Sequence, residues 1–212
     1  MNKSNGKFIT IEGQDGAGKS TNLDVVLASL QDANIEVVVT REPGGTPLGE
    51  KLRSMVLSST DQDFGAMAEL LLIFAARAQH IQEVILPALE AGKWVLCDRF
   101  TDATFAYQGG GRGLDNNKIN ELELLVQGEL QPDLTLLLDV PVEIGEHRAG
   151  MRSAPDRFER QKSEFKARVR QTYLERAEAY PERFRVIDAG EEIDAVKSQV
   201  SSVIADFVAQ NI

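Results

Sequence analysis

A glycine-rich turn between a strand-forming and a helix-forming segment constrains this chain most. Residues 13–20 read Gly13-Gln14-Asp15-Gly16-Ala17-Gly18-Lys19-Ser20, the phosphate-loop pattern of two glycines separated by four residues and followed by Lys and a hydroxyl residue. Residues 7–12 are β-prone, and residues 21–27 repeat apolar side chains at helical spacing. Glycine lets the backbone turn so that several N–H groups face one concavity, and the following helix adds its positive N-terminal end. The segment is therefore predicted to bind nucleotide phosphates.

The loop residues have separate expected roles. We expect Lys19 to reach the β- and γ-phosphates of ATP from a solvent-facing loop, and Ser20 Oγ to bind Mg²⁺. A glycine-rich turn with an incidental Lys is the alternative. The residues expected to contact the ATP phosphates are Gly13, Gln14, Asp15, Gly16, Ala17, Gly18, Lys19, Ser20 and Thr21.

Composition narrows the class of protein. A chain of 212 residues suits one α/β domain, or at most two small ones. A net charge of −10 argues against a general nucleic-acid surface or an anionic-membrane surface, where a basic face is expected. Cys97 is the single cysteine, which rules out an internal disulfide and suggests a reducing compartment. The sequence lacks an apolar stretch of 18 residues, and residues 1–6 are polar and too short for a signal peptide, so we expect a cytoplasmic enzyme.

Short apolar runs alternate with amphipathic stretches along the chain. The expected strands are 8–11, 36–39, 94–97, 134–138 and 184–187. The expected helices are 19–33, 46–57, 66–91, 117–127, 142–149, 163–180 and 193–209, with Pro87 kinking or breaking the third. This alternation predicts a P-loop NTPase fold of the α/β class, a parallel five-stranded sheet flanked by helices on both faces.

Polar residues follow three of these strands. The first strand ends in the phosphate loop, the second in residues 40–45, and the third in Asp98 and Arg99. Ligands of open α/β sheets bind beyond the carboxyl ends of the strands, so these three clusters are expected to converge. Asp98 is a candidate Mg²⁺ ligand, direct or through water, and Arg99 a candidate phosphate-binding residue. A helix N-cap Asp beside a solvated Arg is the alternative.

A resemblance becomes specific when four segments are taken together. The phosphate loop, Arg41-Glu42-Pro43-Gly44-Gly45-Thr46, Asp98-Arg99-Phe100 and Ala106-Tyr107-Gln108-Gly109 resemble the thymidylate kinase family, over about residues 8–189. That family transfers the γ-phosphoryl of ATP to dTMP, giving dTDP and ADP in dTTP synthesis. The resemblance implies Mg²⁺ as cofactor, ATP and dTMP as partners, and a homodimer.

The resemblance also implies roles for individual residues. Asp15 matches a carboxylate that contacts the 3′-hydroxyl of the acceptor sugar, and Arg53 matches a contact to the acceptor phosphate. Phe74 and Arg77, three residues apart on one helix, match an aromatic that stacks on thymine and an arginine that binds its O4. Tyr107 matches a residue beside C2′, and Gln108 matches an amide that reads the base edge. The implied substrate-binding set is Glu42, Pro43, Arg53, Phe74, Arg77, Arg99, Thr104, Tyr107 and Gln108.

Arginines around residues 148–160 predict a mobile lid over the transferring phosphates. The phosphate loop itself carries Ala17 and no arginine, so the chain resembles the class of the family that places its arginine in the lid. Arg152 is the first candidate and Arg157 the second. The predicted catalytic set is then Lys19, Asp15, Arg99, Arg152 and Arg157, and the whole chain is expected to form one kinase domain.

Three other functions compete with this interpretation. A kinase for guanylate or uridylate would lack the Phe74/Arg77 and Tyr107/Gln108 pairs. A GTP-binding switch is suggested by Asn117-Lys118-Ile119-Asn120, which resembles the guanine-reading Asn-Lys-x-Asp but has Asn120 in place of Asp. An inactive nucleotide-binding scaffold conflicts with the intact Lys19. The apolar runs 70–74 and 81–89 are either a dimer interface or core.

Overall fold

The computed structural model describes residues 6–58, 65–150 and 156–212, and its centre is an all-parallel sheet in the order β2-β3-β1-β4-β5. The strands are β1 (Phe8–Glu12), β2 (Val37–Arg41), β3 (Trp94–Asp98), β4 (Leu134–Asp139) and β5 (Phe184–Asp188). All five expected strands are found, each within a residue or two of its expected bounds. The edge strands β2 and β5 are only partly buried, whereas β1 is buried throughout. The predicted fold class is confirmed.

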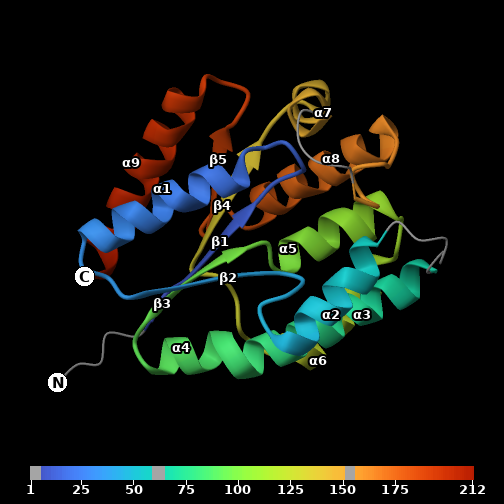
Figure 1. The fold of residues 1–212 in the computed structure, drawn as a ribbon, viewed down its shortest axis with the longest axis horizontal. Coiled ribbons are helices and arrows are strands. Elements are labelled where there is room, and N and C mark those ends of the chain that lie inside the picture. The colour runs from blue at the N-terminus through green and yellow to red at the C-terminus, as the bar shows by residue number, and fades with distance from the viewer. Residues whose placement is uncertain (1–5, 59–64, 151–155) are drawn as a thin grey trace.

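Helices cover both faces of the sheet (Figure 1). The helical segments are α1 (Lys19–Asp32), α2 (Pro47–Leu57), α3 (Ala66–His80), η1 (Ile81–Ile85), α4 (Leu86–Glu90), α5 (Thr101–Thr104), η2 (Phe105–Gly111), α6 (Asn116–Gln127), α7 (Val142–Gly150), α8 (Ser163–Ala179) and α9 (Ile193–Asn211). Helices α1 and α9 lie on one side of the sheet, while α2, α3, α4 and α6 lie on the other.

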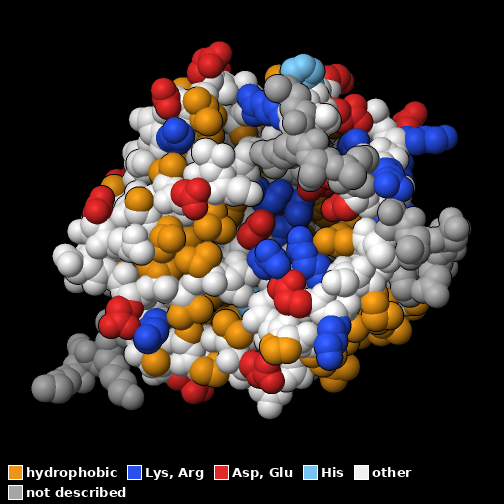
Figure 2. All heavy atoms as spheres, in the orientation of Figure 1, with side chains coloured by type: hydrophobic (Ala, Val, Ile, Leu, Met, Phe, Trp, Pro, Cys, Tyr) orange, Lys and Arg blue, Asp and Glu red, His pale blue; other side chains and the backbone are white. Residues whose placement is uncertain are grey.

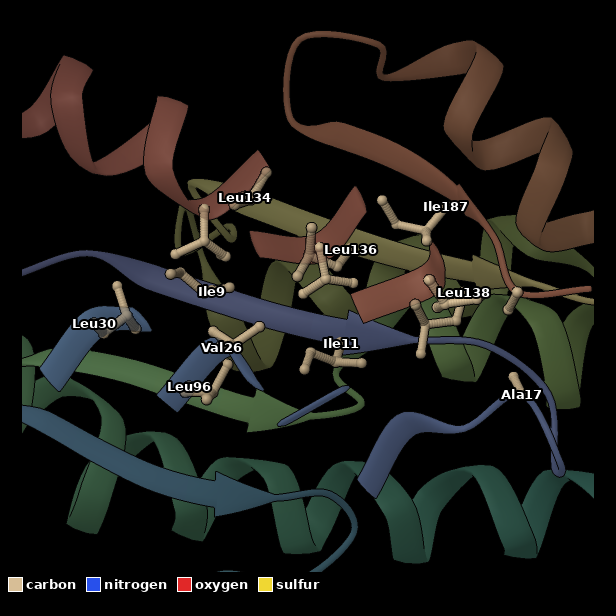
Figure 3. Packing of buried hydrophobic residues seen from close by; sticks show 14 of the residues in the cluster. Ile9, Ile11, Ala17, Val26, Leu30, Leu96, Leu134, Leu136, Leu138 and Ile187 are labelled. Carbon is tan, nitrogen blue, oxygen red and sulfur yellow. The ribbon is translucent and has the colours of Figure 1, made fainter. Parts of the chain in front are cut away.

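The side chains of the central strands alternate between the two faces, as the period of a strand requires. Leu136 and Leu138 of β4 join the core under α1 and α9, which includes Ile9 and Val26 (Figure 3). Leu137, between them, packs into the opposite core with α8. Both faces of β4 are apolar, so β4 is held between two helical layers and its carboxyl end is fixed at the rim.

The expected long helix over residues 66–91 is one helical run with a wider turn in the middle. Residues Ile81–Ile85 form a π-helix between α3 and α4. Pro87 follows this turn and has no N–H to donate to the carbonyl of Glu83, four residues earlier. The irregularity in this helical run therefore begins before Pro87, in the wider turn of residues 81–85.

Residues 101–111 are helical, which the sequence did not predict. Helix α5 runs directly into the π-helix η2, which ends in Gly109-Gly110-Gly111. Three consecutive glycines favour a turn, but here they allow α8 to approach closely. A Cβ on Gly110 would lie 2.1 Å from Thr172 Oγ1, and one on Gly111 would lie 2.6 Å from the Phe165 ring.

None of the helices within the described ranges is long and apolar enough to cross a membrane.

Candidate active site

The phosphate loop connects the central strand β1 to α1. Gly18, the N-cap of α1, has a φ of 86°, in the left-handed region that favours glycine. Gly16 has a φ of 79°, and a Cβ there would lie 2.1 Å from the carbonyl oxygen of Gly145. Gly18 is therefore needed for its backbone conformation, and Gly16 both for its conformation and for its close approach to α7.

Lys19 is not on a solvent-facing loop, contrary to the expectation. It is the first residue of α1 and is 8% exposed, with Nζ donating to the carbonyl oxygens of Gly13 (3.0 Å) and Gln14 (3.2 Å). Burial, followed by the charge of Arg99, lowers the pKa of Lys19 to about 8. The cation is folded back into the loop, where an incoming phosphate can replace the two carbonyls.

Asp15 and Arg99 form an ion pair at the mouth of the loop. Arg99 Nη2 donates to Asp15 Oδ1 (2.8 Å), and the Tyr107 hydroxyl donates to Asp15 Oδ2 (3.3 Å). Burial would raise the pKa of Asp15, but the charges of Arg99 and Lys19 outweigh it and lower the pKa to about 2. Asp15 is therefore a carboxylate at neutral pH and can accept a hydrogen bond from a ligand hydroxyl.

Asp98 and Ser20 lie at the carboxyl end of β3 and the start of α1, where the sequence predicted a Mg²⁺ site. Asp98 Oδ1 is buried and has no hydrogen-bond partner among the described residues. The same part of the chain holds no cluster of three or more His, Cys, Asp or Glu side chains that would bind a metal without a nucleotide. One orphaned carboxylate oxygen plus a hydroxyl fits a Mg²⁺ ion that takes its remaining ligands from phosphates and water.

A cleft that is partly open to solvent adjoins the phosphate loop. In Figure 2 basic and acidic side chains gather in the middle of this face, with apolar surface beside them. The lining brings together most of the predicted acceptor residues. The cleft is lined by Asp15, Glu42, Pro43, Arg53, Val56, Leu57, Ile73, Arg77, Arg99, Phe100, Ala103, Thr104, Tyr107, Gln108, Asp156 and Phe158.

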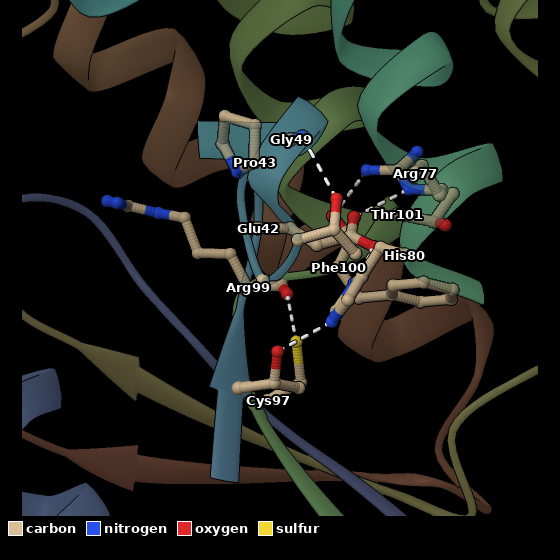
Figure 4. Close-up of polar contacts among 12 residues, drawn as sticks. Glu42, Pro43, Gly49, Arg77, His80, Cys97, Arg99, Phe100 and Thr101 are labelled. Carbon is tan, nitrogen blue, oxygen red and sulfur yellow. Dashed lines mark hydrogen bonds and ion pairs between the residues drawn. The ribbon is translucent and has the colours of Figure 1, made fainter. Parts of the chain in front are cut away.

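Arg77 lies at the buried end of the cleft and is held on three sides. Its Nε donates to Glu42 Oε2 (2.7 Å), and its Nη2 donates to Thr104 Oγ1 (2.8 Å) and to the Phe100 carbonyl (3.2 Å) (Figure 4). The third nitrogen, Nη1, is buried and has no hydrogen-bond partner among the described residues. Arg77 is among the residues that line the cleft, and a fixed guanidinium with one unused donor is suited to bind a carbonyl oxygen.

Phe74 does not line this cleft, although the sequence suggested it as the stacking surface. It is 2% exposed, packs with Leu70, Phe105 and Ile119, and lies under Arg77, whose guanidinium carbon is 4.8 Å from the ring centroid. Ile73 lines the cleft instead. One helical turn holds 3.6 residues, so the side chains three and four positions before Arg77 point to opposite sides of the Arg77 side chain. Phe74, three positions before Arg77, therefore faces the core, whereas Ile73, four positions before it, faces the cleft.

Arg53 and Gln108 line the cleft and are held by neighbours. Arg53 Nη1 donates to the Pro43 carbonyl (2.9 Å). Gln108 Nε2 donates to Glu69 Oε1 (2.9 Å), and Glu69 has no exposed surface.

The Glu69 carboxylate also binds two arginines. Arg112 Nη2 lies 3.1 Å and Arg157 Nη1 lies 2.7 Å from Glu69 Oε2. Arg157 is thus anchored to α3. Arg152, the first lid candidate, lies outside the described residues.

A second cleft borders the other side of the phosphate loop, and the sequence reasoning did not anticipate it. It lies between residues 16–22 and residues 189–196, and Arg148 Nη1 donates to the Ala189 carbonyl (2.6 Å) at its edge. Thr21, predicted as a phosphate contact, is part of this lining. Because this second cleft lies beside the phosphate loop, it is suited to hold the sugar and base of a nucleotide whose phosphates bind the loop.

The sequence did not predict three positions of α3 that lie beside Arg77, namely Glu69, Ile73 and His80, although a signal was present. With Arg77 they recur at helical spacing on the buried face of α3, where the polar side chains of Glu69, Arg77 and His80 are unusual. The suggested guanine-reading segment is excluded: residues 117–120 form the first turn of α6, not a loop after a strand.

A five-stranded parallel sheet with a phosphate loop on its central strand, a free carboxylate on the next strand and a cleft lined by arginines defines a P-loop nucleotide kinase. The sequence profile of the thymidylate kinase family matches residues 11–200. The chain belongs to the thymidylate kinase family.

Relatives and a solved structure agree with this. The chain is 53% identical over 203 residues to thymidylate kinase of Pseudomonas syringae pv. tomato (strain ATCC BAA-871 / DC3000), covering 96% of this chain and 97% of that protein. It is 55% identical over 204 residues to thymidylate kinase of Nitrosospira multiformis, covering 96% and 99%. The crystal structure of thymidylate kinase from Ehrlichia chaffeensis aligns with a TM-score of 0.76 and 36% identity, covering 94% of this chain and 98% of that one. The family and the thymidylate kinase function predicted from the sequence are confirmed.

Proposed function

We propose that the chain transfers the γ-phosphoryl of ATP to dTMP, giving dTDP and ADP in dTTP synthesis, with the acceptor in the cleft around Arg77. The observation that carries this proposal is the unused Nη1 donor of Arg77, a residue that lines the cleft. A thymine O4 is an acceptor, whereas the amino group of cytosine at that position is a donor and would face the guanidinium unfavourably.

The donor phosphates are held by the glycine-rich turn, the start of α1 and Lys19. Ser20 and Asp98 would hold Mg²⁺, which neutralises phosphate charge when it is bound. Lys19 leaves the Gly13 and Gln14 carbonyls for phosphate oxygens, and negative charge nearby raises its pKa again. The protonated amine then stabilises the charge that develops in transfer.

The acceptor sugar and phosphate lie between Asp15, Arg53, Arg99 and Tyr107. Asp15 accepts from the 3′-hydroxyl, and Arg53 and Arg99 bind the acceptor phosphate. Tyr107, held by Asp15 and Arg99, sits beside C2′ and disfavours a ribose hydroxyl. Transfer is in line between two fixed oxygens and needs neither a covalent intermediate nor a strong base.

Arg152 supplies the lid arginine, and Arg157 orders the chain that follows it. The support for this division is that Arg157 pairs with buried Glu69 on the acceptor side. We assign the lid to about residues 148–160 of one kinase domain that spans residues 1–212.

We further propose a homodimer in the cytoplasm. The runs 70–74 and 81–89 are divided: Leu70, Phe74 and Ile85 are core, whereas Leu71 is 51% and Leu86 40% exposed. The exposed pair, with Met67 at 36%, is the candidate contact. Sedimentation of the wild type and Leu71→Glu tests it, and an unchanged mass would contradict it.

The test of the proposed function is a coupled ATP-consumption assay against a panel of nucleoside monophosphates with Mg²⁺ present. We expect dTMP to give the highest kcat/KM. Equal or better turnover of GMP, AMP or CMP would overturn the proposal.

A further inference from the structure

A chain of hydrogen bonds runs from Arg77 away from the cleft. Glu42 binds Arg77 Nε through Oε2 (2.7 Å) and His80 Nδ1 through Oε1 (2.8 Å). His80 Nε2 is 2.6 Å from Thr40 Oγ1. His80 has no exposed surface, and Glu42 and Arg77 are 3% and 1% exposed. Strand β2 and helix α3 are therefore joined through one histidine that the proposed transfer does not use.

The two ring nitrogens of His80 have different partners, so a donor and an acceptor can be assigned to each hydrogen bond of this series. With hydrogen on Nδ1, the ring donates to Glu42 Oε1, and Nε2 accepts from the Thr40 hydroxyl. This assignment satisfies each of the three groups and keeps the buried charge to one carboxylate and one guanidinium. Both oxygens of Glu42 are then occupied, so its carboxylate has one orientation.

The ring itself is held in place by the turn after β2. A Cβ on Gly45 would lie 2.5 Å from His80 Cδ2 and 2.7 Å from Thr40 Oγ1. Gly45 has a φ of 76°, which also favours glycine. Figure 4 shows His80 and Arg77 on the same side of Glu42. The His80 ring that Glu42 binds is thus packed closely against the turn after β2.

We propose that His80 is a positioning residue for recognition of the acceptor base. It fixes Glu42, and Glu42 fixes the plane of the Arg77 guanidinium, so that Nη1 is presented to the cleft. The inference deepens the proposed function, because it depends on Arg77 reading the base. His80 does not touch the substrate and acts only through Glu42 and Arg77.

The test uses two substitutions that each keep one ring nitrogen. His80→Asn places an amide N–H near the position of Nδ1 and can still donate to Glu42. His80→Gln places its amide near the position of Nε2 and leaves Glu42 without that donor. We expect His80→Gln to weaken dTMP binding by about tenfold, the effect of one lost hydrogen bond to a charged group. The ratio of the dTMP affinity to the dCMP affinity should fall in the same variant. His80→Asn should stay within about threefold of the wild type, and ATP affinity should not change in either variant.

Calorimetry with each nucleotide gives the affinities, and thermal melts verify folding. Equal effects of Asn and Gln, an unchanged dTMP affinity in His80→Gln, or a parallel loss of ATP binding would each overturn the inference. If His80→Gln does not fold, His80→Leu provides the second measurement. It also leaves Glu42 without the donor that Nδ1 supplies, so it should weaken dTMP binding by about tenfold and leave ATP binding unchanged; no change in dTMP binding would overturn the inference.

Arg77→Ala, measured in parallel, separates this inference from the proposed function. If Arg77→Ala leaves dTMP binding unchanged, the proposed role of Arg77 fails. If Arg77→Ala weakens binding and His80→Gln does not, only the role of His80 fails.

Discussion

At the residue scale, two ion pairs of oppositely charged side chains lie in the cleft. Arg77 has Glu42 as its counter-ion, and Asp15 has Arg99. A buried charge pair of this kind costs desolvation free energy, and losing one member leaves the other uncompensated. Substitutions here therefore change stability as well as binding, and both must be measured.

Arg77→Ala should weaken dTMP binding by about ten- to a hundredfold, since an unmade hydrogen bond to a charged donor costs about 1.5–3 kcal/mol. ATP affinity should barely change, and the preference for thymine over cytosine should narrow. Because Glu42 is left buried without its arginine, the free energy of unfolding should also fall by about 3–5 kcal/mol. Calorimetry and denaturant titration measure the two effects. An equal loss of ATP binding would mark Arg77 as structural only.

Lys19→Ala should lower kcat at least about a hundredfold, as for other preorganised electrostatic groups. Nζ now binds only two loop carbonyls, so the alanine variant should retain a cooperative melt. Steady-state kinetics and thermal melts measure both. Near-native turnover, or loss of the melt, would contradict this prediction.

At the element scale, α3 is the helix that organises the acceptor side. One face of it presents Glu69, Ile73, Arg77 and His80, which contact η2, the cleft and β2. The helix itself was predictable from its apolar periodicity. The sequence did not predict whether Phe74 or Ile73 would meet the cleft, because the two positions differ only in which neighbouring element covers them.

Two arginines of the lid region should differ in kinetic effect. Arg152→Ala should lower kcat by roughly 10²–10⁴, a range set by arginine fingers, with a smaller effect on ATP affinity. Arg157→Ala should instead raise KM for dTMP more than it lowers kcat, because Arg157 pairs with Glu69 beside Gln108. Initial-rate kinetics on both nucleotides separate the two.

Arg185→Ala is the matched control for this pair, since Arg185, on the edge strand β5, donates to nearby backbone carbonyls, those of Pro181, Glu182 and Phe184. It should leave both constants unchanged. The reverse pattern, with kcat lost in Arg157→Ala and only KM for ATP raised in Arg152→Ala, would exchange the two roles.

At the scale of the whole molecule, the parallel sheet brings the site together. Strand β3 lies between β1 and β2, so the segments after residues 12, 41 and 98 meet although they are far apart in sequence. The same packing buries Glu12, which accepts from the Phe100 N–H (2.7 Å) and the Tyr173 hydroxyl (2.8 Å).

This burial makes stability depend on pH. Burial, followed by repulsion from Asp102, raises the pKa of Glu12 from 4.5 to about 8. Between these values the unfolded chain releases a proton that the folded chain keeps. The contribution of Glu12 to the free energy of unfolding therefore falls as pH rises from about 4.5 to about 8. Glu12→Gln removes this titration, so its Tm relative to the wild type should increase between pH 5 and pH 8.

Partly exposed Glu50 is the control, since hydrogen bonds from Arg41 and Gly45 lower the pKa of its carboxyl. Glu50→Gln should show no such gain as pH rises. Parallel Tm curves for the wild type and Glu12→Gln would contradict the assignment of the proton to Glu12.

The sequence by itself determined the phosphate loop, the five strands and the convergence of their polar ends. Local signals suffice for these, because glycine conformation, apolar periodicity and strand alternation act over a few residues. The tertiary structure decided which side of α3 faces the cleft, that Lys19 folds back into the loop, and that residues 101–111 are helical. It also decided that His80 pairs with Glu42, and Glu69 with Arg112 and Arg157. Each of these depends on contacts between residues tens of positions apart, and nothing in the local sequence specifies which distant side chain becomes the partner.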